Sequence, residues 1–201
     1  MHGCLPKSRY EEIEDTVIDM LEECEVMHYP IDPFELARKL RYKLRPYSSL
    51  NESKREWAFG ESKDGFSQLE EDEITGMTYY VIYYNDGEKN VGRLRWTILH
   101  EIGHCYLGHH CLRHVNKKVT EEEANHFAKY ALAPPPLVKA LGIHSVSELK
   151  KVFITSREAA EHSIEFYRGW LGYKRHHPDL SDREIRLSRM QYRYSACEYL
   201  F

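Results

Sequence analysis

A chain of 201 residues suits one domain, or one domain with a small appendage, and can bury a core without disulfides or a structural metal. Its 42% hydrophobic and 30% charged residues exclude a disordered chain, and a net charge of -4 disfavours a strongly basic nucleic-acid-binding protein. The amino terminus has no signal-peptide pattern, and no apolar run approaches the roughly 20 residues of a membrane span, so we expect a cytoplasmic protein with free cysteines.

Charge is distributed unevenly along the chain. Residues 1–90 carry 11 basic and 20 acidic side chains, whereas residues 91–201 carry 17 basic and 12 acidic ones. Such an asymmetry can steer a charged partner, and the plainer interpretation is a solvated surface.

The first half of the chain predicts two helices followed by mixed structure. Residues 10–27 place apolar side chains at helical spacing. Asp32 can cap a second helix that has Pro33 in its first position. Residues 42–69 predict short strands and loops, and the β-branched and aromatic run at 77–84 predicts a strand closed by a turn.

The second half of the chain predicts mainly helices. Apolar residues recur at helical steps from Val91 to about Gly108, and another helix opens near Thr120 as its N-cap and ends at the prolines of 134–136. Two shorter helices follow serine N-caps: 146–153 after Ser145 and 157–170 after Ser156. We therefore divide the chain into a main α+β unit, residues 1–140, and a helical appendage, residues 141–201.

Histidine is concentrated in one segment, because five of the 12 histidines fall between residues 100 and 114. There, His100 and His104 are one helical turn apart on one face, where both imidazoles can bind one zinc ion. Glu101 lies beside them and can act on water as a general base without being a ligand, which completes the zincin signature. The alternative interpretation is a pair of exposed histidines on a helix.

A third zinc ligand is expected on the next helix. Glu121 is the preferred residue and Glu122 is the fallback. Asn125 lies one turn after Glu121 and can accept the free ring N–H of His100. The alternative for 121–123 is acidic residues that only complement the helix dipole.

The other clustered histidines predict no defined site. A second metal site with Cys105 of the preceding helix is one interpretation, but the spacing matches no closed structural-zinc pattern. We therefore interpret four of these residues as polar loop residues: His109, His110, Cys111 and His114. The sequence does not identify the residue that stabilises the oxyanion.

A family resemblance follows from these motifs. Residues 93–109 resemble the active-site helix of the ImmA/IrrE family of zinc metallopeptidases, and Glu121 to Pro134 resembles its glutamate helix, with Leu132-Ala133-Pro134 where the family has a Leu-Leu-Met-Pro-like stop. Tyr29 to Ala37 is similar to the helix that opens the family domain, so the resemblance covers about residues 10–140. Residues 146–167 resemble a helix-turn-helix-like segment of some members, and an ordinary helical pair is the alternative.

The resemblance implies both a fold and a function. The fold is α+β, a zincin-like core of the gluzincin type with a small mixed sheet and an active-site helix, followed by a helical C-terminal segment. The function is a zinc-dependent endopeptidase of phages, integrative elements or stress responses that cleaves a helix-turn-helix repressor and relieves transcriptional repression. We expect a substrate chain to add, through backbone hydrogen bonds, beside the strand of Tyr79, Tyr80, Val81, Ile82, Tyr83 and Tyr84.

Two other functions stay open at this point. In the first, the protein is a non-catalytic, zinc-containing regulator that binds a repressor or DNA through 146–167 and the basic tail, although 174–193 holds a modest six basic and three acidic residues. In the second, it is a peptidase with a different target, such as a toxin-system partner.

Overall fold

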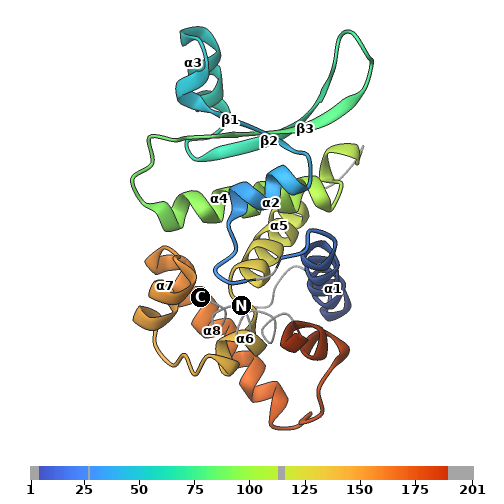
Figure 1. The fold of residues 1–201 in the computed structure, drawn as a ribbon, viewed down its shortest axis with the longest axis vertical. Coiled ribbons are helices and arrows are strands. Elements are labelled where there is room, and N and C mark those ends of the chain that lie inside the picture. Colours follow the sequence, from blue (N-terminus) through green and yellow to red (C-terminus); the bar gives the residue numbers. More distant parts are fainter. Residues whose placement is uncertain (1–4, 27, 113–115, 190–201) are drawn as a thin grey trace, which may run out of the picture.

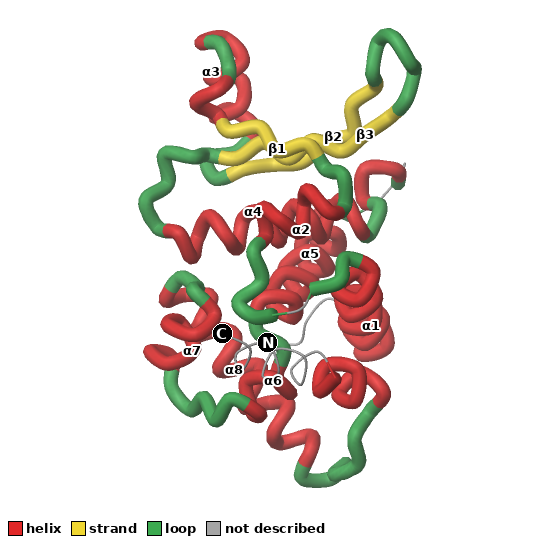
Figure 2. The backbone as a smooth tube through the Cα atoms, viewed as in Figure 1, coloured by secondary structure: helices red, strands yellow, loops and turns green. Residues whose placement is uncertain are grey.

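The computed structural model describes residues 5–26, 28–112 and 116–189. The sheet lies against one side of α4, with α3 beyond it, while α1 and α5 to α8 lie on the other side (Figures 1 and 2). The elements are α1 (Lys7–Glu23), α2 (Pro33–Lys39), β1 (Lys43–Pro46), the 3-10 turn η1 (Tyr47–Ser49), α3 (Glu52–Glu61), β2 (Gly65–Glu71), β3 (Thr78–Tyr84), α4 (Val91–Tyr106), the 3-10 turn η2 (His109–Cys111), α5 (Lys117–Leu132), α6 (Pro135–Ala140), α7 (Val146–Phe153) and α8 (Arg157–Lys174). This arrangement confirms the expected α+β fold with a small mixed sheet. None of the described helices is long and apolar enough to span a membrane.

The sheet has the order β1-β3-β2, so β3 is its central strand. β1 pairs with β3 in parallel from Val81 to Tyr84, and β2 pairs antiparallel along all of β3. This topology corrects the expectation that a substrate adds beside β3 at Val81, Ile82, Tyr83 and Tyr84, because β1 and β2 occupy both edges of the strand there. At Tyr79 and Tyr80 only the β2 edge is paired, so the expectation stays a prediction for these two residues. Among the described residues, the outer edge of β2 has no partner strand.

Helix α4 occupies the centre of the molecule because it is apolar on several faces. Its side chains Ile98, Leu99 and Ile102 are fully buried in the main core, which they share with α1, α2 and α5. Asn90 caps the helix by accepting a hydrogen bond from the backbone of Arg93 at 3.2 Å. The predicted helix from Val91 is therefore confirmed, and it is held rigidly between the sheet and α5.

Two predictions of local structure are wrong: the start of one helix and the content of the segment 42–69. Helix α5 begins at Lys117 under an Asn116 cap, so Thr120 lies inside the helix instead of capping it. The segment 42–69 contains the helix α3, which buries only Ala58 and therefore shows no apolar stripe in the sequence. The caps at Asp32, Ser145 and Ser156 are confirmed.

The C-terminal helices form a second core with α6. It includes Leu137, Leu149, Phe153 and Ile164, while Ala159 of α8 belongs to the main core. The division of the chain at residue 140 stays a prediction.

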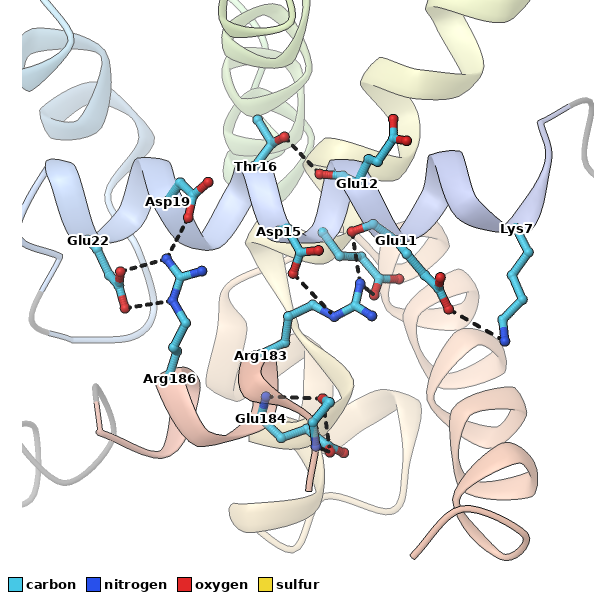
Figure 3. Close-up of polar contacts among 12 residues, drawn as sticks. Lys7, Glu11, Glu12, Asp15, Thr16, Asp19, Glu22, Arg183, Glu184 and Arg186 are labelled. Carbon is cyan, nitrogen blue, oxygen red and sulfur yellow. Dashed lines mark hydrogen bonds and ion pairs between the residues drawn. The ribbon is translucent and has the colours of Figure 1, made fainter. Parts of the chain in front are cut away.

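A final helical segment, 182–189, packs against α1 and pairs charges with it (Figure 3). Arg186 lies 2.6 Å from both Asp19 and Glu22, and Arg183 lies 3.1 Å from Glu14 and 3.5 Å from Asp15. Two basic side chains from the second half of the chain are thus paired with acidic side chains from the first half.

Candidate active site

The helices that carry the predicted zinc ligands pack directly on each other. His100 and His104 lie one turn apart on α4, and Glu121 lies in the second turn of α5. The two histidine Nε2 atoms are 3.1 Å apart, and carboxylate oxygens of Glu121 lie 3.4 Å from His100 Nε2 and 3.7 Å from His104 Nε2. The structure therefore brings the three side chains together, with one ligand atom of each within 4.8 Å of the others.

This spacing fits a small tetrahedral cation. A zinc ion with bonds of about 2.0–2.1 Å holds its ligand atoms roughly 3.3 Å apart, and the distances above bracket that value. Because each histidine Nε2 faces the other, at most one of the two can carry a proton, whereas a shared cation satisfies both lone pairs. Two imidazoles and one carboxylate also leave a fourth position for water or substrate.

Glu101 stands beside this cluster as a buried carboxylate. Its Oε2 accepts a hydrogen bond of 2.7 Å from the hydroxyl of Ser67 on β2, and Ser67 Oγ also lies 2.9 Å from Nε2 of His110. Burial raises the pKa of Glu101, and the Ser67 hydrogen bond partly opposes this rise. A carboxylate with a raised pKa is suited to exchanging a proton near neutral pH.

The structure places Asn125 near His100. Nδ1 of His100 is buried without a partner among the described residues. The Asn125 side chain lines the same cavity and contributes to raising the pKa of His100. A hydrogen bond with Asn125 is one of the causes of that rise, so the predicted contact between the amide and the ring N–H stays a prediction.

The electrostatics favour the metal-binding forms of two of the three ligands. Burial and the neighbouring His100 lower the pKa of His104 to about 3, so this imidazole is neutral. A hydrogen bond with His100 lowers the pKa of Glu121, which keeps its carboxylate ionised. For His100 itself burial opposes protonation, but Glu121 and Glu101 outweigh it and raise the pKa. A bound cation reverses that rise, because it takes the place of the proton.

A chain of contacts that the sequence did not predict lies behind His104. Nδ1 of His104 is 2.9 Å from Nδ1 of His109, and Nε2 of His109 is 2.8 Å from Oε2 of Glu123. Arg9 of α1 donates to Oε1 of Glu123 at 2.7 Å. The one sequence signal is Gly108, whose φ of 70° ends α4 and turns the chain back toward the site.

Other candidate ligands point away from the cluster. The hydroxyl of Tyr10 donates to Glu122 at 2.8 Å, so the fallback ligand faces α1. Burial raises the pKa of Cys105 to about 12, which keeps it a thiol, while Cys111 is exposed. His114 lies outside the described residues. Within the described ranges, the His100, His104 and Glu121 group is the one placed to hold a metal ion.

The cluster opens into a cavity of about 500 Å³ between α4, α5 and β2. Its wall includes the three clustered side chains and the neighbouring residues Gly65, Phe66, Ser67, Trp96, Glu101 and Asn125. The unpaired edge strand and the candidate metal site therefore share one open space.

Comparison with protein families gives the context for this geometry. A family model described as the IrrE N-terminal-like domain (Peptidase_M78) matches residues 59–165, just over half of the chain. The chain belongs to this family. It is accordingly a metallopeptidase of the ImmA/IrrE type with a zincin-like fold. The IrrE-like match extends from the end of α3 into α8 and leaves out α1 and α2, so it lies further along the chain than the expected 10–140. Comparison with curated proteins finds no match.

Proposed function

We propose that the protein is a zinc-dependent endopeptidase that cleaves a helix-turn-helix transcriptional repressor of the phage type and so relieves repression. The observation that carries the chemical part is the convergence of His100, His104 and Glu121 beside the buried carboxylate of Glu101 in an open cavity. The choice of a repressor as substrate is supported by the family resemblance.

The residues of the cavity have distinct roles in this reaction. His100, His104 and Glu121 would hold the zinc ion. Bound zinc supplies Lewis acidity, which polarises a peptide carbonyl and makes water acidic enough to lose a proton near pH 7. Ser67 engages Oε2 of Glu101, which leaves Oε1 to accept the proton of the attacking water and return it to the departing amine.

The substrate chain would lie along β2. A peptide that adds to the free edge of this strand gains backbone hydrogen bonds and runs over the cavity that holds Glu101. This placement keeps strand addition as the binding mode but moves it from the central strand β3 to the edge strand.

A cleavage assay tests the proposal. The purified protein is incubated with the repressor encoded next to its gene, with zinc or with a chelator, and the fragments are identified by mass spectrometry. We expect cleavage with zinc and none with the chelator. Glu101→Gln should bind zinc normally and cleave about 10²- to 10⁴-fold more slowly, because it removes the general base. Cleavage by this variant at the wild-type rate would show that the base is assigned wrongly.

The neighbouring carboxylates of α5 provide a matched control. Glu121→Gln removes a ligand and should lose zinc and cleavage, whereas Glu122→Gln changes a side chain that faces Tyr10 and should keep both. Equal loss in the two variants would count against Glu121 as the third ligand. Cleavage of other proteins but not of the repressor would favour a peptidase with a different target.

The non-catalytic alternative receives less support from the described tail. Arg183 and Arg186 are engaged by carboxylates of α1 and so are not presented to a phosphate backbone (Figure 3). Two aromatic residues of the basic tail that could stack on nucleic-acid bases, Tyr192 and Tyr194, lie outside the described residues.

A further inference from the structure

His109 contacts the proposed metal ligand His104 at Nδ1, the ring nitrogen that does not face the other ligands. It follows Gly108 in the short turn η2, and its ring nitrogens bridge His104 on one side and Glu123 on the other. Its side chain is only 4% exposed, and that of Glu123 is 9% exposed. The contacts are therefore shielded from water. Hydrogen bonds to charged groups are stronger in such a buried environment than in water.

The direction of these hydrogen bonds is fixed by the metal-binding form of His104. A histidine that binds a cation through Nε2 carries its proton on Nδ1, and that proton needs an acceptor. Nδ1 of His109 at 2.9 Å accepts it, so Nε2 of His109 carries the remaining ring proton and donates to Glu123 at 2.8 Å. All four nitrogens of the two rings then have consistent roles, with both imidazoles neutral.

Arg9 is the last residue in this series of contacts, and it lies outside the segment matched by the family model. Its Nε donates to the second carboxylate oxygen of Glu123 at 2.7 Å, and the two side chains form an ion pair between α1 and α5. Glu123 thus accepts from Arg9 through one carboxylate oxygen and from His109 through the other, which orients the His109 ring.

We infer that His109 is a positioning residue for the metal centre: with Glu123 and Arg9 it fixes the ring orientation and tautomer of His104, so that helix α1 contributes to metal affinity. This inference rests on the proposed function, because it takes His104 as a metal ligand.

Two amide substitutions separate the two contacts of His109. The side-chain oxygen of asparagine can occupy the position of histidine Nδ1, whereas glutamine reaches the position of Nε2. His109→Asn should therefore keep an acceptor for His104, and His109→Gln should keep only the contact with Glu123. We expect zinc affinity, measured by competition with a chromophoric chelator, to fall roughly 10- to 100-fold in His109→Gln and His109→Ala and by much less in His109→Asn.

A second buried histidine supplies the matched control. His126 pairs with Glu14 at 3.2 Å across the same α1–α5 interface and is equally buried, but it does not contact the ligands. His126→Phe should leave zinc affinity unchanged. Arg9→Met should weaken binding less than His109→Gln, because it acts through Glu123.

The visible spectrum of the cobalt(II)-substituted protein reports ligand geometry independently of stability. It should change in His109→Gln and stay as in the wild type in His109→Asn and His126→Phe. Wild-type affinity and spectrum in His109→Gln, or the same loss of zinc in His126→Phe, would overturn the inference. If the wild-type protein and His104→Ala bind zinc equally, the proposed metal site itself is wrong, which is a separate result.

Discussion

The hydrogen bond from Ser67 to Glu101 leads to a specific prediction for the pH dependence of cleavage. It joins β2 to α4 at 2.7 Å, both side chains are buried, and it lowers the pKa of a carboxylate that burial raises. Ser67→Ala removes the donor and should raise the pKa of Glu101 further. A general base works only when ionised, so activity is lost as the pH falls through this pKa, and the loss should begin at a higher pH in the variant.

The size of the effect follows from the nature of the contact. A buried hydrogen bond to a charged group contributes about 1.5–3 kcal/mol. Since about 1.4 kcal/mol corresponds to a tenfold change in an equilibrium, the acid limb of kcat/KM should move by about one pH unit or more toward neutral pH. At alkaline pH, where Glu101 is ionised in both proteins, kcat/KM should differ little.

The assay is cleavage of the repressor, or of a peptide that spans the cut site, as a function of pH. Ser67→Thr is the control, because it retains a hydroxyl for Glu101 and for His110 and should restore the wild-type profile. A profile of Ser67→Ala that superimposes on the wild type would refute the reasoning. A uniform decrease at every pH would also refute it, since it would mean that Ser67 positions Glu101 without altering its ionisation.

Three further predictions concern stability. Gly92→Ala should lower the free energy of unfolding in urea by about 1–3 kcal/mol or more, because a Cβ at Gly92 would lie 2.1 Å from the carbonyl carbon of Thr155. Val91→Ala, at an exposed position, is the control and should change the free energy of unfolding little. Arg186→Ala should lower the free energy of unfolding, measured by thermal unfolding, by about 1 kcal/mol at low salt and by less at high salt, because its ion pairs lie at the surface. An unchanged melting temperature at low salt would contradict a stabilising role for these ion pairs. Zinc at about 100 times its dissociation constant should stabilise the protein by about 2.7 kcal/mol, and this gain should be absent in His104→Ala.

Features that depend on local spacing could be predicted from the sequence. His100 and His104 are four residues apart on one helix, so their common face follows from helical geometry alone. The caps at Asp32, Ser145 and Ser156 are likewise local, because each side chain bonds to a backbone group two or three residues away.

Features that depend on distant segments could not be predicted in this way. The edge position of β2 follows from the pairing order of three strands, whereas the sequence of β3 stands out because that strand is central and strongly apolar. Ser67 and Glu101 are 34 residues apart, and Arg9 and Glu123 are 114 apart. Helix α3 cannot be predicted from apolar periodicity, because a mostly exposed helix has none.

The same distinction explains how the site is divided along the chain. The proposed ligands and the base lie on two adjacent helices inside the family match, where their spacing can be recognised in a single sequence. The groups that tune them reach the site from elsewhere: Ser67 from the sheet, and Arg9 from α1, which lies outside the match. Helix α1 is in turn held by core side chains such as Ile13 and Val17 and by the ion pairs of Arg186. Metal affinity is therefore expected to depend on packing at the amino terminus, although that segment supplies none of the proposed ligands.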